Sequence, residues 1–347
     1  MIHFYPMTYS HNKLPKSLVE IKAEVPWEEF ELYHGQAVAD LAKEIRLEGF
    51  RPGHVPPRVA EKYISEEKVL VEMAERSIRD VYIKAVQEHN LQIIGEPKVE
   101  ILKLAKANPF EFRVEVSVLP EIELPSYQKI AEKVERKIVT VEDKEVEDTI
   151  NWLRESRKTS DGAIPEVTDE FAMSLGDFQS MDELRASLKE GLQKEKETKE
   201  KERLREEILE KIAKEAKAEI PLALIEREKQ SMLDRMRQGV SQTLRMQFDK
   251  YLEQAKKTEQ ELLYSFGEEA EKRVKKYLVL RDISEKEQVV VTPEEVEEEI
   301  TRISSYYKSI GAAERDFDPE RLKEYTEGLM RNEKTMDILE GFVKSNS

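Results

Sequence analysis

The segment of this sequence best suited to binding another molecule is Gly49-Phe50-Arg51-Pro52-Gly53-His54-Val55-Pro56. Its centre carries proline and then glycine where a type II turn needs them, because proline presets the first central φ and glycine supplies the positive second one. The flanking segments, 25–48 and from Pro57 onward, have helical patterns, and each begins with a proline near its first helical position. We therefore predict a rigid hairpin of two helices with Phe50 and Arg51 held out at its tip. The alternative is a plain connection in which Phe50 folds back onto its own stems.

A second candidate surface is a run of apolar residues that recur at every fourth position. On one continuous helix this spacing drifts by about 40° per step, so the run would spiral by about 200°. A single flat partner cannot cover such a spiral, so we expect part of it to line a cleft, where Met and Leu adapt to irregular apolar partners. The alternative, for each residue taken singly, is ordinary core between antiparallel helices. The residues are Met232, Met236, Val240, Leu244, Phe248 and Leu252.

Other kinds of chemistry are not indicated. The absence of cysteine excludes thiolate catalysis and disulfides, and no Gly-rich lysine motif of a nucleotide-binding loop occurs. Carboxylates are so frequent that pairs of them say nothing about acid–base catalysis. We expect no cofactor and no metal, because the histidines are scattered without the spacing of metal ligands: His3, His11, His34, His54 and His89.

The charge distribution separates an acidic body from a basic tip. The net charge of −16 argues against general binding of nucleic acids. Around the tip, however, Arg46, Arg51, Arg58 and Lys62 outnumber the anions Glu48 and Glu61. With 37% charged residues, long solvated helices are expected. The N-terminus does not resemble a signal peptide, and no stretch approaches the roughly 20 apolar residues that span a bilayer. We expect a cytoplasmic protein that does not bind membranes.

The elements around the tip are predicted to form an α+β N-terminal domain over residues 17–120, after an N-terminal extension, 1–16, to which no role is assigned. Strict alternation of apolar and polar residues predicts strands at 17–25, 98–104 and 110–118, and a helical pattern covers 66–89. A small antiparallel sheet with helices packed on one face is the expected architecture, with the helical hairpin protruding from it.

The rest of the chain is predicted to be helical. Residues 121–164 form an extended linker and a helix capped by Thr140. Residues 165–347 form an elongated all-α C-terminal domain with arms. Helices are expected to begin at Pro221, at the capping box Thr292 to Glu295, and at Asp318-Pro319. The charged stretch 194–203 has mixed signs, which favours a solvated helix face over an interaction tail.

The pattern Gly49-Phe50-Arg51-x-Gly53, followed by Pro56, resembles the ribosome-docking motif of the trigger factor family of bacterial chaperones. This chain departs from the family at Pro52 and His54, where relatives often carry lysine. The similarity of arrangement runs from about residue 17 to the C-terminus. Its one large gap lies near 160–165, where the family has a prolyl isomerase domain similar to the FK506-binding proteins, which this chain is predicted to lack.

The resemblance implies an ATP-independent chaperone that docks on the large ribosomal subunit beside the exit tunnel. Its Phe50-Arg51 tip would contact protein and RNA there, and its helical body would shield nascent or unfolded polypeptides. Two alternatives are a prolyl isomerase, disfavoured by the missing domain, and a ribosome-independent holdase or scaffold. The oligomeric state stays open between a monomer and a homodimer.

His54 leads to one further hypothesis. A histidine in place of a permanent cation is expected to strengthen docking as the pH falls through the range around 6.5.

Overall fold

The structure is a computed structural model that describes residues 8–51, 53–158, 162–309 and 318–344, with 306–309 described by their backbone alone. The chain divides into two compact units. Unit 1 comprises the residues up to Glu121 together with Ala218–Lys275, and unit 2 comprises Ile122–Lys217 and the residues from Lys276 onward. Part of the helical region therefore belongs to the same compact unit as the N-terminal sheet. The domain boundaries expected along the sequence remain a prediction.

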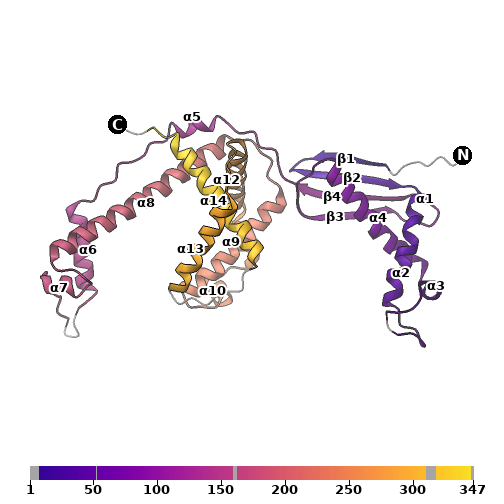
Figure 1. Ribbon diagram of the computed structural model, residues 1–347, viewed down its shortest axis with the longest axis horizontal. Coiled ribbons are helices and arrows are strands. Elements are labelled where there is room, and N and C mark those ends of the chain that lie inside the picture. The colour runs from indigo at the N-terminus through magenta and orange to yellow at the C-terminus, as the bar shows by residue number, and fades with distance from the viewer. Residues whose placement is uncertain (1–7, 52, 159–161, 310–317, 345–347) are drawn as a thin grey trace. The chain divides into compact units, whose positions relative to one another are not determined.

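Unit 1 contains a four-stranded antiparallel sheet (Figure 1). Its strands are β1 (Thr8–Leu14), β2 (Leu18–Val25), β3 (Ile93–Lys103) and β4 (Phe110–Val118), in the order β1-β2-β4-β3. The strong alternation in β2 and β4 predicted both strands correctly, and cross-strand neighbours such as Ile21 and Val114 are buried together. Strand β1 was not predicted, because none of its side chains is buried and its structure depends on pairing with β2.

The helices that pack on this sheet lie on one face, as predicted (Figure 1). They are α1 (Trp27–Phe30), α2 (His34–Glu44) and α4 (Glu66–Glu88), with the 3₁₀ turn η1 (Glu31–Tyr33). The short helix α3 (Pro57–Ala60) packs against α2 instead and is followed by the 3₁₀ turn η2 (Glu61–Tyr63). The helical segment predicted to reach residue 48 ends earlier, at Glu44, because Ile45 takes an extended backbone. Helix α4 packs against β1, β2 and β4. Edge strand β3 has less cover, and its Val99 and Ile101 are each 45% exposed.

The second part of unit 1 is a set of helices in the region predicted to carry an arm, and these helices are called the arm below. They are α9 (Leu222–Thr243), α10 (Phe248–Ala255), α11 (Glu259–Ser265) and the first half of α12 (Gly267–Lys286), which ends in unit 2. Helix α9 begins directly after Pro221, as predicted.

Unit 2 is helical in all its regular elements that the structure describes. These are α5 (Tyr127–Ala131), α6 (Asp143–Glu155), α7 (Asp169–Met173), α8 (Met181–Glu215), α13 (Pro293–Ser309), α14 (Pro319–Gly341) and the end of α12. The predicted starts at Thr292 and Asp318 are confirmed, since both side chains accept hydrogen bonds from backbone N–H groups in the first turn. The predicted cap at Thr140 is wrong, because Glu142 and Glu145 form a capping box there, and α5 makes part of the linker helical.

The charged stretch 194–203 within α8 is not a fully solvated face. Glu200 is only 8% exposed, and its carboxylate accepts hydrogen bonds from the backbone N–H of Lys137 (2.7 Å) and from the Arg203 guanidinium (2.7 Å). A buried carboxylate is tolerated because it is paired and fully hydrogen-bonded. Glu200 therefore fastens the segment after α5 to the long helix α8.

Candidate functional site

The predicted tip is a pair of consecutive β-turns between α2 and α3. The backbone N–H of Phe50 donates to the carbonyl of Leu47 (3.2 Å), and that of His54 donates to the carbonyl of Arg51 (3.0 Å). The φ of Gly53 is +80°, the value that a type II turn needs at its third residue and that a side chain would strain. Pro52, at the second position, lies outside the described residues. The turn predicted from the sequence is thus present around it.

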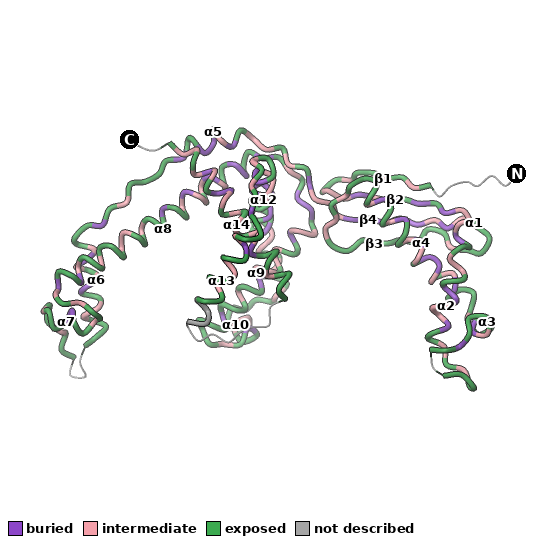
Figure 2. The backbone as a smooth tube through the Cα atoms, viewed as in Figure 1, coloured by how far each residue is buried: buried purple, intermediate pink, exposed green. Residues whose placement is uncertain are grey.

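The apolar and cationic side chains of the tip face solvent. Phe50 is 40% exposed, so it is not folded back onto its stems. Arg51 is exposed, as are the remaining described residues of the motif, Gly49, Gly53, His54 and Pro56. Figure 2 shows exposed residues on both sides of the turn. Among the described residues of the motif, Val55 alone is buried, and it packs with Ala42 and Ala60 in a small core.

The stem of the tip is anchored to the sheet domain by polar contacts between helices. Arg76 of α4 forms ion pairs with Asp40 of α2 and, at 2.9 Å, with Glu72. The Tyr33 hydroxyl donates to the Asp80 carboxylate (2.9 Å), and burial together with this bond raises the pKa of Tyr33 to about 12. Tyr33 therefore stays protonated as a donor over the physiological range. These contacts fix the direction in which α2 leads to the turn.

The cations of the tip are free to meet an anionic partner. Across the described parts of the chain, Arg46, Arg51, Arg58 and Lys62 form no ion pair, and all four are exposed. Of the two nearby anions, Glu61 lies 3.7 Å from His34 Nε2. The local positive sign expected from the sequence is therefore not cancelled by neighbouring carboxylates.

The predicted apolar run 232–252 does not lie on one helix, and the spiral inferred for it is wrong. Helix α9 ends at Thr243, residues 244–247 form a connection in which Arg245 has a φ of +49°, and α10 begins at Phe248. Spacing by four residues continues across this break, but no helix carries it. Apolar periodicity alone could not reveal the break, since neither glycine nor proline marks it.

The residues of this run serve two different purposes in the arm. Val240 and Phe248 are buried with Leu233 and Leu262, and Met236 and Leu252 pack half-buried around them. The Arg237 guanidinium lies over the Phe248 ring at 5.2 Å and pairs with Glu259 at 2.6 Å. Met232 is half-buried outside this cluster. Leu244 is 54% exposed, so it is the member of the run most available to a partner.

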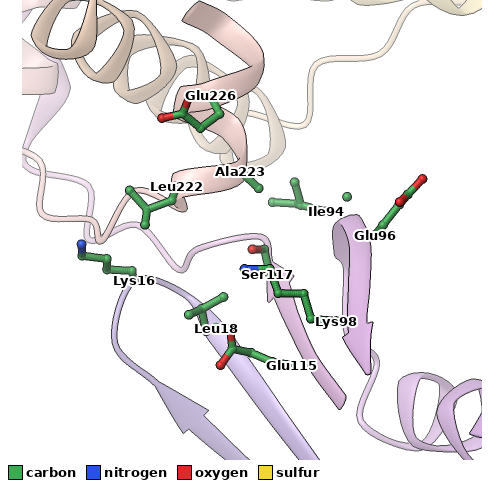
Figure 3. A pocket seen from close by; sticks show the side chains of 11 residues that line it. Lys16, Leu18, Ile94, Glu96, Lys98, Glu115, Ser117, Leu222, Ala223 and Glu226 are labelled. Carbon is green, nitrogen blue, oxygen red and sulfur yellow. The ribbon is translucent and has the colours of Figure 1, made fainter. Parts of the chain in front are cut away.

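One feature of unit 1 was missed by the sequence analysis. A cavity of about 340 Å³ lies between the end of the sheet and the first turn of α9 (Figure 3). Its apolar lining comes from Leu18, Ile94, Leu222 and Ala223. The first and last of these residues are just over two hundred positions apart in the sequence, so no local pattern could have indicated them.

Neither a metal site nor a membrane span is found in the described part of the chain. No cluster of three or more His, Asp or Glu side chains there is arranged to hold an ion. Likewise, none of its helices is both long and apolar enough to cross a bilayer.

Two family models match the sequence, and together they span most of it. The model of the bacterial trigger factor protein matches residues 7–153, and that of the trigger factor C-terminus matches residues 180–340. The first match includes all four strands and continues through α5 and most of α6, and the second includes α8 to α13 and nearly all of α14.

Full-length relatives are also similar. The trigger factor of Carboxydothermus hydrogenoformans is 24% identical, over 96% of this chain and 98% of that protein. That of Caldicellulosiruptor bescii is 24% identical over 93% of each chain. The first alignment is 422 positions long, more than the 347 residues of this chain, so the relative contains segments without a counterpart here.

A solved structure described in terms of promiscuous substrate recognition by the trigger factor chaperone has the same fold. It superimposes with a TM-score of 0.56 and 18% identity, over 96% of this chain and 99% of that one. Together these matches define the class of protein as a molecular chaperone. Within that class, the chain belongs to the trigger factor family.

Proposed function

We propose that this chain is an ATP-independent chaperone of the cytoplasm that docks on the large ribosomal subunit beside the exit tunnel and shields emerging polypeptides. The tip formed by Phe50 and Arg51 is the docking element, and Gly49, Pro52, Gly53, His54 and Pro56 shape it. The partners are ribosomal protein and RNA at the tunnel and unfolded polypeptide chains.

The observation that carries this proposal is the exposed Phe50 beside Arg51, which forms no ion pair with any described residue, on a turn held by two backbone hydrogen bonds. An aromatic and a guanidinium group are the side chains most often responsible for binding energy at interfaces. Because these hydrogen bonds already hold the described backbone on either side of Pro52, docking is expected to cost little further conformational entropy. The surrounding free cations favour an RNA-rich surface, and the acidic body disfavours any other orientation.

For the client-binding part, we propose the apolar arm around α9 and α10, with Leu244 and the half-buried methionine Met236 as contact residues. Val240 and Phe248 support this surface from beneath, because they form the arm's own core. Client binding then rests on burial of apolar surface, at about 25 cal/mol per Å², and requires no nucleotide.

We further propose that the chain acts without prolyl isomerase activity. Only residues 156–168 separate α6 from α7, and part of the boundary near 160–165 lies outside the described residues. The surplus length of the alignment with the Carboxydothermus relative supports the same proposal. The runner-up function, a ribosome-independent holdase, shares the arm and lacks the docking role of the tip.

Ribosome co-sedimentation tests the docking proposal. We expect Phe50→Ala/Arg51→Ala to reduce ribosome affinity by about tenfold or more, as loss of a central interface residue does. The matched control is Leu32→Ala/Arg79→Ala, which removes an exposed apolar side chain and an exposed arginine of unit 1 away from the tip. Equal pelleting of the tip variant and the control would remove the tip from the mechanism and favour the ribosome-independent holdase.

A further inference from the structure

The cavity at the end of the sheet is formed by two segments of unit 1 that hydrogen bonds hold in place. The turn between β1 and β2 holds the chain just before α9, since the Lys16 N–H donates to the Glu219 carboxylate (2.6 Å) and the Ser17 hydroxyl donates to the Glu219 carbonyl (2.7 Å). A Cβ added at Gly95 would lie 3.9 Å from the Cβ of Ala223, so the first turn of α9 passes close to β3 at this glycine. The first turn of α9 is thereby fixed over the sheet, and the space between them stays open.

The walls of the cavity suit a large apolar side chain. Leu18, Ile94 and Leu222 point their side chains toward the same space (Figure 3). None of the three is buried, and Leu222 is 50% exposed although it is a leucine. A volume of about 340 Å³ is at the small end of natural ligand pockets, so it fits one or two large side chains rather than a folded partner.

The backbone beside the cavity is open to an extended chain. The pairing of β3 with β4 is interrupted between Ile94 and Lys98, so residues 95–97 have no partner in the register of the two strands. β3 is also an edge strand of the sheet. An extended segment that runs along such an edge binds through main-chain groups whatever its sequence, while alternate side chains enter pockets.

The rim of the cavity carries both signs of charge. Figure 3 places Lys16 and Glu96 at opposite sides of the apolar wall. Across the described residues, neither Lys16 nor Glu96 forms an ion pair, nor do Lys98 and Glu115, whereas Glu226 is paired with Lys229 at 2.6 Å. Free carboxylates and free ammonium groups in equal number disfavour a phosphate or a nucleic acid. They complement a segment in which charged side chains of opposite sign flank an apolar one.

We propose that this cavity is a second client site, which binds an extended stretch of unfolded polypeptide by one large apolar side chain flanked by an acidic and a basic residue. The inference rests on the proposed chaperone function and adds a site separate from the arm. The apolar side chain fills the space between Ile94 and Leu222, and the flanking charges meet Lys16 and Glu96.

Methyl NMR of the full chain tests this proposal with a short synthetic peptide as the probe. The peptide carries one Leu, with Asp and Lys two residues away on either side, in a Gly/Ser background, and a second peptide has Ser for Leu. We expect the Leu peptide to shift the methyl signals of Leu18 and Ile94, and the Ser peptide to bind about tenfold more weakly or worse, since a buried leucine side chain is lost.

Two variants locate the binding. Leu222→Ala, which shortens the cavity wall, is expected to weaken the Leu peptide about threefold to tenfold, and Leu32→Ala, also an exposed leucine of unit 1, is expected to leave it unchanged. Glu96→Gln is expected to weaken it by up to about threefold, since its charge is solvent-accessible.

Shifts confined to the arm around Leu244, or equal affinity for Leu222→Ala and the unaltered chain, would overturn the inference. Shifts of Ile94 that depend on protein concentration without peptide would assign the cavity to a second copy instead, which also overturns it. Ribosome pelleting is independent of all these readouts, so the docking proposal and this one can fail separately.

Discussion

At the scale of single residues, polar side chains that are nearly buried decide how the long helix α8 is connected to the preceding segment. Glu200 is the clearest case, because it joins Arg203 on its own helix and the backbone of Lys137. The Arg203 hydrogen bonds, helped by the Lys137 N–H, lower the pKa of Glu200 from its usual 4.5 to about 2. A carboxyl whose pKa is lowered by folding stabilises the native state above its unfolded pKa.

This coupling predicts a pH-dependent effect of Glu200→Gln. At pH 7 the variant is expected to lose about 2 kcal/mol of unfolding free energy, since charged hydrogen bonds are replaced by neutral ones. The difference should shrink as the pH falls from about 4.5 toward 2, where the native carboxyl takes up its proton. Urea denaturation at several pH values measures it.

Glu190→Gln is the matched control on the same helix, because Glu190 is exposed and its one ion pair among the described residues is with Lys194. Its effect should stay below about 1 kcal/mol. If Glu200→Gln loses equally little unfolding free energy at pH 7, or if its loss does not change with pH, Glu200 does not hold the segment after α5 on α8.

The tip residues illustrate how far local reasoning extends. The turn Arg51 to His54 could be predicted because the φ preferences of proline and glycine are properties of those residues themselves. The exposure of Phe50 could not be derived in the same way, since it depends on Val55, rather than Phe50, filling the space beside Ala42 and Ala60. Whether His54 makes docking depend on pH remains a prediction.

At the scale of elements, the arm combines a core with a surface in very few residues. Phe248, Val240, Leu233 and Leu262 hold α9, α10 and α11 together, while Leu244 occupies the connection between two of these helices. Replacing Phe248 would therefore remove a core side chain, at a cost of about 3 to 5 kcal/mol, and would confuse folding with client binding.

Leu244→Ser distinguishes an effect on client binding from an effect on folding, since an exposed side chain contributes little to stability. We expect this variant to keep its thermal midpoint within a few degrees and to suppress aggregation of an unfolded client about twofold less well. The aggregation is followed by light scattering. Leu329→Ser, at a comparably exposed leucine of α14, is the control and should behave like the unaltered chain. Unchanged suppression by Leu244→Ser would exclude the arm connection as a client contact.

At the scale of the whole molecule, the family match and the short stretch between α6 and α7 lead to a prediction about catalysis. We expect the chain to give no acceleration of cis–trans isomerisation of a short proline peptide above the uncatalysed rate, which is slow at tens to hundreds of seconds. A protease-coupled assay measures this, with an authentic prolyl isomerase as the positive control. Acceleration that increases in proportion to the concentration of this chain would restore the isomerase function.

The sequence by itself determined those features that depend on interactions within a few neighbouring residues. The turn of the tip, the alternating strands β2 and β4, and the helix starts at Pro221, Thr292 and Asp318 all follow from dihedral preferences, side-chain alternation and capping bonds within a few residues. The family resemblance was carried by the same local signals, above all by Gly49 to Pro56.

Only the tertiary structure decided the features that depend on distant partners. Strand β1 exists because β2 pairs with it, Glu200 is buried because Lys137 meets it, and α9 ends at Thr243 because the helices that follow fold back around Phe248. The cavity beside Ile94 needs a helix more than a hundred residues later in the chain. Each of these contacts joins groups that are far apart in the sequence, so the pattern of neighbouring residues cannot predict them.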